Sequence, residues 1–129
     1  MTTPQYFPIA ACAPVSDPDA APYDKRWLVV DTSGRLLTRN ECPALAQITV
    51  KISFGYLAIR APEMLRMDIP LDVIEDDDSL IQQASIGVQQ VNVVDEGDLT
   101  AAWVSNFLGI ACRLVKIHPE APTVFWPEL

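Results

Sequence analysis

The sequence contains a single histidine, His118, and five glycines that are never closer together than ten residues. Phosphate-binding loops and dinucleotide-binding turns need clustered glycines, so both are excluded. A serine or cysteine nucleophile would have to use His118 as its base, and no local motif supports that pairing. A histidine-based metal site would need carboxylate or thiolate partners, and none is suitably spaced. We expect His118 to lie exposed in a proline-rich tail.

Cysteine is also scarce: Cys12, Cys42 and Cys112 lie 30 and 70 residues apart, and none belongs to a CxxC motif. The odd count and wide spacing argue against a disulfide framework and against a zinc site. We expect small buried thiols, as in a reducing cytoplasm. The chain also lacks a secretory signal pattern and any apolar run approaching the roughly 20 residues of a membrane span. These absences predict a cytoplasmic protein that does not enter membranes.

Positive charge is the next deficit, because 9 basic residues face 17 acidic ones and give a net charge of −8. No Lys or Arg occurs between Met67 and Cys112, a stretch that holds the acidic run 75–78. That run lacks the alternating ligands of a calcium loop and predicts a solvated turn. We do not expect nucleic acid as a partner, because binding its phosphates needs a basic surface. One basic cluster could bind an anion or form ordinary solvated surface: Lys25, Arg26, Arg35 and Arg39.

A length of 129 residues, half of them hydrophobic, indicates one domain with one real core. Short alternating or apolar runs predict strands at 26–31, 35–38, 48–54, 56–60, 65–69, 88–94 and 112–117. The first two would form a hairpin through the turn at 32–34. We predict a single domain over 1–129, with an ordered core at about 6–117 and a proline-rich tail at 118–129.

One α-helix is predicted near the C-terminus, with Asp98 as its N-cap and Gly109 as its left-handed terminator. Its apolar stripe would comprise Leu99, Ala102, Trp103 and Phe107. A shorter helical turn is expected at 43–47, and Trp27 is expected in the core. These elements favour a mainly β fold, a closed or nearly closed antiparallel β-barrel of about seven strands with one firm α-helix. An open α+β sandwich is the alternative.

Three segments together resemble a known family. Residues 7–15 resemble an aromatic-Pro-Ile-Lys-Ser opening, and residues 24–38 begin with Asp-Lys-Arg-Trp and are followed by Pro-Ala-Leu at 43–45. Residues 95–109 contain Ala-Ala-Trp-Val-Ser-Asn-Phe-Leu-Gly and lead into 112–115. In this order and spacing, the chain resembles the MOSC N-terminal β-barrel domain over about residues 6–117. That domain precedes the MOSC domain in molybdenum-cofactor sulfurases and amidoxime-reducing molybdoenzymes.

The resemblance implies a position beside an anionic molybdopterin cofactor, but several matching residues differ. The amidoxime-reducing relatives hold the cofactor with the Lys-Ser pair, here Ala10 and Ala11, and with an Arg that is here Lys25. A further Arg of that family is here Asn40. Lysine lacks the planar fork that grips phosphate, and each lost charge-assisted bond costs roughly 1.5–3 kcal/mol. We therefore expect the chain to bind no cofactor. The family resemblance alone leaves open a molybdopterin-type cofactor.

The leading hypothesis is a stand-alone, non-catalytic β-barrel domain that acts as a binding or interaction module. The resemblance places the molybdenum-binding cysteine in the MOSC domain, and none of the three cysteines here matches it, so no activity of its own is expected. Lys25, Arg26 and Arg39 are weak candidates for an anion site. The alternative is a barrel component that acts with a separate MOSC-domain protein, with Lys25 and Arg26 facing the cofactor. A small-molecule carrier is a third possibility, opposed by the bulky inward side chains.

Overall fold

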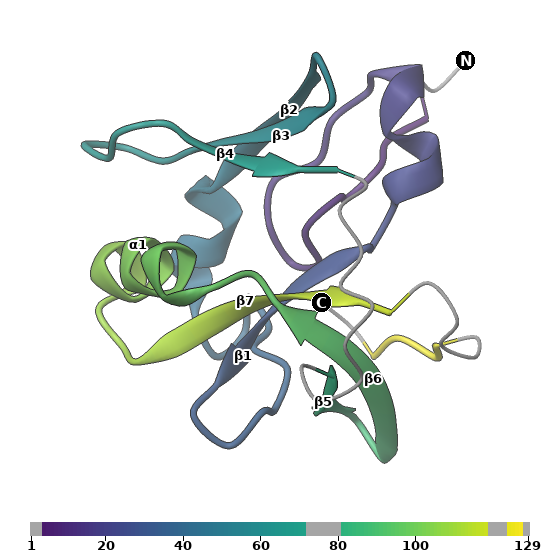
Figure 1. Cartoon of the computed structure of the whole chain (residues 1–129), viewed down its shortest axis with the longest axis vertical. Coiled ribbons are helices and arrows are strands. Elements are labelled where there is room, and N and C mark those ends of the chain that lie inside the picture. The colour runs from purple at the N-terminus through teal and green to yellow at the C-terminus, as the bar shows by residue number, and fades with distance from the viewer. Residues whose placement is uncertain (1–3, 72–80, 119–123, 128–129) are drawn as a thin grey trace.

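The computed structural model describes residues 4–71, 81–118 and 124–127. The acidic run 75–78 lies outside the described residues. One antiparallel sheet has the order β1 (Trp27–Asp31), β7 (Cys112–Ile117), β6 (Gln89–Asp95) and β5 (Ile81–Ile86). The other has the order β2 (Thr49–Ser53), β3 (Tyr56–Arg60) and β4 (Met67–Pro70). The helix α1 (Asp98–Leu108) packs against β7, and two 3₁₀ helices are η1 (Pro18–Tyr23) and η2 (Pro43–Gln47) (Figure 1).

The mainly β fold with one α-helix is therefore confirmed, whereas a closed barrel of seven strands is not. The strands belong to two separate sheets, and the four-stranded sheet curls into a half-barrel. Its edge strands are linked by a short segment: Val30 of β1 bridges Leu36, and the Leu36 N–H donates to the Ser85 carbonyl of β5 at 2.9 Å. The edges of the half-barrel are thus satisfied without the second sheet, which explains why the seven strands do not join.

Side chains fill the interior of the half-barrel. This cluster comprises Ala10, Leu28, Val30, Leu36, Ala84, Ile86, Val91, Val93, Val115 and Ile117. Val124 and Trp126, from the predicted tail, pack against it, and the Gln89 side chain holds the Phe125 backbone with two hydrogen bonds of 3.3 Å. A packed interior of this kind gives no support to the carrier hypothesis.

A second core cluster lies on the other face of β1. Successive side chains of a strand point to opposite faces, so Trp27 and Val29 enter this cluster while Leu28 and Val30 enter the half-barrel. The second cluster also takes up Leu57 and Ile59 of β3 and therefore joins the two sheets. Burial on both faces explains why β1 is an unbroken apolar run.

Three cysteines lie in that second cluster, and their burial was predicted from the sequence. Cys12, Cys42 and Cys112 are buried free thiols. Burial raises the pKa of Cys12 to about 12 and raises the pKa of both other thiols. Trp27 is fully enclosed, Trp103 is nearly so, and Phe107 packs half-buried at the margin. His118 is half-buried rather than exposed, and its N–H donates to the Asn92 carbonyl at 3.0 Å.

Several strand predictions need correction. No strand forms at 35–38, where the chain makes only isolated bridges, from Leu36 to Val30 of β1 and from Arg35 to Ser85 of β5. The predicted strand 88–94 begins at Gln89, and its partner β5 was missed because Gln82 and Gln83 interrupt the apolar pattern. The strand predicted at 65–69 begins at Met67, and Leu65 is 87% exposed in the preceding loop.

The helix was predicted at the right place, and of its predicted apolar stripe Trp103 and Phe107 pack against the core whereas Leu99 and Ala102 do not. Its N-cap is Gly97, and Asp98 is its first residue, while Gly109 adopts the expected left-handed conformation with φ of 75°. Leu99 is 79% exposed and Ala102 is exposed. The buried side chains are Thr100, Ala101, Trp103 and Val104. The packed face of the helix is therefore rotated from the predicted one but still includes Trp103.

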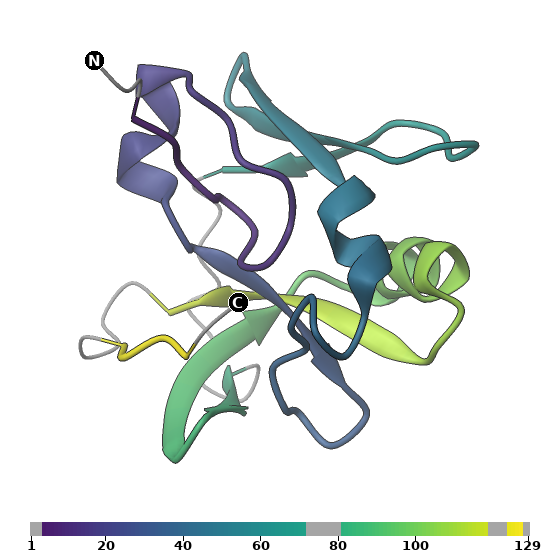
Figure 2. The same cartoon turned by 180° about the vertical axis from the view of Figure 1, so that it is seen from behind.

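The N-terminal segment stands beside the three-stranded sheet, as seen from behind in Figure 2. The Ala13 N–H donates to the Ile48 carbonyl at 3.0 Å, next to the start of β2. The two proline-rich ends are not wholly irregular, because η1 lies in the first. No helix in the described part of the chain has the length and apolar character needed to cross a membrane.

Candidate functional site

The loop that carries the family's opening motif is closed against β1. Ile9 bridges Trp27, and the Ala10 N–H donates to the Trp27 carbonyl at 2.8 Å. Ala10 and Ala11 are both 0% exposed; Ala10 belongs to the half-barrel cluster and Ala11 to the second cluster. Ala11 has a φ of 70°, which turns the chain sharply between the two cores. Neither residue presents a donor group to solvent.

Lys25 and Arg39 both meet Phe7. The Lys25 backbone N–H donates to the Phe7 carbonyl at 2.7 Å, and the Asp24 carboxylate accepts from the Phe7 backbone N–H at the same distance. The guanidinium of Arg39 lies over the Phe7 ring, 5.8 Å from its centroid. The structure therefore brings Lys25 and Arg39 to one neighbour, and both are half-buried.

The other predicted cations lie elsewhere. The Arg26 carbonyl accepts from the Ile117 N–H at 2.8 Å, which makes Arg26 part of the β1–β7 ladder. Arg35 forms ion pairs with Asp31 at 3.5 Å and Glu41 at 3.0 Å. The predicted basic cluster is thus divided, with Arg35 already neutralised.

These residues do not fit the anionic cofactor that the family resemblance implies. The positions of the Lys-Ser pair hold enclosed alanines, and the Ala10 N–H is already bonded. Asn40 is exposed and uncharged where an arginine would be expected. Lys25 retains a charge, but a single lysine lacks the bidentate grip on a phosphate group.

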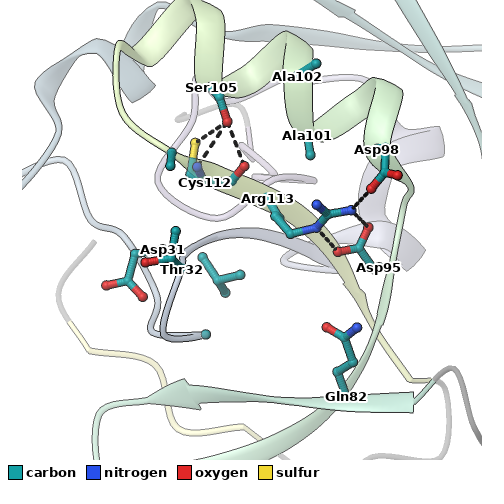
Figure 3. A pocket seen from close by; sticks show the side chains of 13 residues that line it. Asp31, Thr32, Gln82, Asp95, Asp98, Ala101, Ala102, Ser105, Cys112 and Arg113 are labelled. Carbon is teal, nitrogen blue, oxygen red and sulfur yellow. Dashed lines mark hydrogen bonds and ion pairs between the residues drawn. The ribbon is translucent and has the colours of Figure 1, made fainter.

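A pocket of about 490 Å³ lies between α1, the start of β7, the turn after β1, and β5 (Figure 3). Its polar lining includes Asp31, Thr32, Gln82, Asp95, Asp98, Ser105 and Arg113. Its volume falls in the range of small-molecule sites. Sequence inspection missed this pocket because its lining comes from five separate segments, and no local motif joins them.

The turn on one side of the pocket is built around Asp31. The Asp31 carboxylate accepts from the N–H groups of Ser33 at 2.8 Å and Arg35 at 3.1 Å. The hydrogen bond from the Arg35 N–H, followed by that from Ser33, holds the pKa of this carboxyl below its ordinary value. Gly34 has a φ of 80°, and a Cβ there would meet the Gln83 carbonyl at 3.2 Å. The turn therefore holds the Asp31 carboxylate in its ionised form, paired with Arg35.

The opposite side of the pocket is an ion cluster around Arg113 (Figure 3). Arg113 binds the Asp95 carboxylate through Nε and through Nη2, the latter at 3.0 Å, and Nη2 also contacts Asp98 at 2.7 Å. These hydrogen bonds raise the pKa of Arg113 above its ordinary value. Arg113 is thus committed to carboxylates of its own chain and is poorly placed to bind an external anion.

The pocket has little means for covalent chemistry. The Ser105 hydroxyl donates to the Cys112 carbonyl at 2.8 Å and accepts from the Cys112 N–H at 3.0 Å, so it is fully engaged. The described residues hold no group of three or more His, Cys, Asp or Glu side chains suited to a metal. With three carboxylates and one paired guanidinium, the lining disfavours anions and suits polar or cationic molecules.

Comparison with known proteins identifies the family. Residues 5–111 match the MOSC N-terminal beta barrel domain, and the chain belongs to that family, as the sequence indicated. It is 31% identical over 123 residues to molybdenum cofactor sulfurase of Danio rerio and 28% identical over 119 residues to that of Homo sapiens. These matches cover 88% and 85% of this chain, but only 15% and 13% of the sulfurases.

A further relative is mitochondrial amidoxime-reducing component 1 of Danio rerio, 26% identical over 99 residues, 75% of this chain and 30% of that protein. The chain therefore spans less than a third of each of these relatives. A solution structure of a Bordetella bronchiseptica protein is 53% identical and superimposes with a TM-score of 0.84, covering 98% of both chains. Two chains of this identity and coverage share the same fold throughout.

Proposed function

We propose that this chain is a non-catalytic binding domain of the MOSC N-terminal family that has lost its contacts to the molybdenum cofactor. The observation that carries the proposal is the enclosure of Ala10 and Ala11, both 0% exposed, where the family resemblance implies a Lys-Ser pair. A charged side chain at position 10 would have to enter the packed half-barrel. Local packing and the identity of the residues therefore both oppose an anion site here.

The remaining features support a binding role over catalysis. In the pocket beside α1, the Ser105 hydroxyl is not free to act as a nucleophile, because it is hydrogen bonded to the Cys112 backbone. The three thiols are buried, with raised pKa values that oppose formation of the nucleophilic thiolate. These features favour a domain that binds other molecules over one that catalyses a reaction.

Reconstitution with molybdopterin tests this function. The purified chain is incubated with the cofactor and desalted, and molybdenum and pterin are quantified by plasma mass spectrometry and fluorescence. We expect much less than one equivalent, and Lys25→Ala should retain the same residual amount as the wild type. Stoichiometric retention that falls in Lys25→Ala would overturn the proposal, because it would identify a working cofactor contact.

A second candidate function is that of a barrel component acting with a separate MOSC-domain protein. It is favoured by an apolar patch beside α1, where Leu65 and Leu99 are exposed next to the nearly buried Trp103. The Trp103 indole N–H donates to the Leu65 carbonyl at 2.8 Å, and Leu99 lies one helical turn before Trp103. Exposed apolar patches of this kind often mark interaction sites.

Co-elution with a separately produced MOSC domain tests this second candidate. A complex on size-exclusion chromatography that is weakened by Leu99→Gln, while the neighbouring exposed Ala102→Gln has no effect, would support it. Separate elution of both proteins, with and without cofactor, would count against it.

A further inference from the structure

The outer face of the three-stranded sheet is open. Leu57, Ile59 and Ile69 point into the core, so the alternate residues of the same strands point outward. That set, termed here the outer-sheet face, comprises Lys51, Ser53, Tyr56, Ala58, Arg60 and Asp68, together with Phe54 and Arg66 at the adjoining turns. Figures 1 and 2 show this sheet at the top, and no element drawn in the described part of the chain lies over it.

A hollow of about 250 Å³ opens on this face. It is lined by Ser53, Phe54, Tyr56, Ala58, Arg66 and Asp68. The strand register pairs Ala58 with Lys51 on one side and with Asp68 on the other. Ala58 lies at the floor of the hollow and is only 5% exposed, because the larger side chains around it stand close to its methyl group. The volume of the hollow above it suits about one side chain from outside.

Phe54 sits at the rim of this hollow in a costly conformation. The pairing of Ser53 with Tyr56 makes Phe54 and Gly55 a two-residue hairpin loop, and their φ values are 49° and 81°. Two positive φ angles favour Asn-Gly in such a loop, and a bulky residue there is strained. Phe54 is also 98% exposed, so packing within this chain does not offset the backbone strain at this residue. A strained, fully exposed aromatic residue points to a contact made outside the chain.

The charge of the outer-sheet face is opposite to that of the whole protein. Lys51, Arg60 and Arg66 are exposed cations, and Asp68 is the acid among them, paired with Arg66 at 3.1 Å. The chain as a whole carries a net charge of −8. Complementary charge guides association and selects partners, so this face suits an acidic ligand.

We propose that the outer-sheet face binds an extended acidic segment of a partner protein. An apolar side chain of that segment enters the hollow over Ala58 against the Phe54 ring, and its carboxylates meet Lys51 and Arg60. The discrete hollow favours a peptide side chain over a lipid surface. This inference deepens the proposed binding function, and it rests on that function because it names the partner of such a module.

Fluorescence anisotropy with synthetic peptides tests the proposal on the full chain. The probe is a labelled peptide of alternating glutamate and leucine, and its controls replace glutamate by lysine or leucine by serine. We expect the first peptide alone to bind, with an affinity that falls as salt rises. Phe54→Asn should weaken binding roughly tenfold or more, and Lys51→Gln with Arg60→Gln should flatten the salt dependence.

Phe125→Asn is the matched control, because Phe125 is 75% exposed on another part of the molecule. It should leave peptide binding unchanged. Phe54→Asn should also raise the thermal midpoint, since asparagine tolerates the left-handed conformation. A lower midpoint would show that Phe54 is structural and would overturn the proposal.

Other outcomes would also overturn it. These are no peptide binding at about 1 mM, or binding that Phe54→Asn leaves intact. Phe54-dependent binding to phosphatidylserine–phosphatidylcholine vesicles in place of the peptide would identify a membrane surface. Self-association in sedimentation velocity that Phe54→Asn abolishes would identify a second copy of this chain. Molybdenum content, measured on the same samples, separates these failures from a failure of the proposed function.

Discussion

The ammonium group of Lys116 on β7 donates a hydrogen bond of 2.9 Å to the carbonyl oxygen of Leu71, just after β4. Lys116 is only 6% exposed, and it lies 5.2 Å from the ring centroid of Trp27, its partner in the β1–β7 register. A second carbonyl, that of Pro70, lies 3.4 Å from Nζ. This buried cation therefore ties the half-barrel to the end of the three-stranded sheet.

Removing that tie should destabilise the protein. Lys116→Met keeps most of the apolar stem but leaves the Leu71 carbonyl without its donor, and we expect the free energy of unfolding to fall by about 1–3 kcal/mol. Lys116 also interacts with the Glu96 carboxyl: burial raises the pKa of Glu96, and the positive charge of Lys116 lowers it. Urea denaturation measures the change, with the exposed Lys51→Met as a control within about 0.5 kcal/mol of wild type. Equal stability of the two variants would contradict the role given to Lys116.

The thiols should be unreactive in the folded protein. Burial raises the pKa of Cys12 to about 12, and Cys42 and Cys112 are raised by burial as well, so thiolate is scarce near neutral pH. A chromogenic disulfide reagent should modify the native chain slowly and should modify all three thiols at once in denaturant. Rapid stoichiometric modification of the native chain would show that one cysteine is accessible.

The turn at Asp31 should make stability depend on pH. Because its folded pKa lies below the ordinary value of 3.8, ionised Asp31 stabilises the fold above that pH. The contribution is lost as the pH falls through the lower, folded value. The difference in unfolding free energy between wild type and Asp31→Ala should be largest near neutral pH and should shrink in acid. A difference that does not change with pH would assign the effect to turn geometry alone.

The enclosure of Ala10 predicts a large cost for the residue that the family resemblance implies. Ala10→Lys would place an ammonium group in the half-barrel core, and we expect a loss of more than about 3 kcal/mol. Asn40→Arg, at an exposed position, should stay within about 0.5 kcal/mol of wild type. Thermal and urea unfolding measure both. An Ala10→Lys variant of wild-type stability would mean that the loop opens readily, which would weaken the proposed function.

Local signals in the sequence predicted the parts of the fold that depend on neighbouring residues. The apolar run before Asp31, the alternation before Phe54 and the glycine after the helix each gave an element in the right place. The strand β5 was missed because Gln82 and Gln83 face solvent there and hide its pattern. Propensity alone therefore could not show the fourth strand of the half-barrel.

The pairing of strands distant in the sequence and the exposure of individual apolar side chains could not be predicted from the sequence. Which strands share a ladder depends on contacts such as that of Leu36 with Ser85, and no local pattern records them. Leu99 read as a core residue because it is apolar, yet it is exposed. The clustering of basic residues pointed to Lys25 and Arg39, and in the structure the Lys25 backbone and the Arg39 guanidinium both contact Phe7. The pocket beside α1 and the outer-sheet face became visible only when distant segments were placed together.

The central proposal is that this domain does not bind the molybdenum cofactor. Native mass spectrometry of the chain after incubation with molybdopterin tests it most directly. We predict the mass of the bare chain for the wild type and for Lys25→Ala, with no adduct that survives buffer exchange. A one-to-one cofactor adduct on the wild type that disappears in Lys25→Ala would contradict the account.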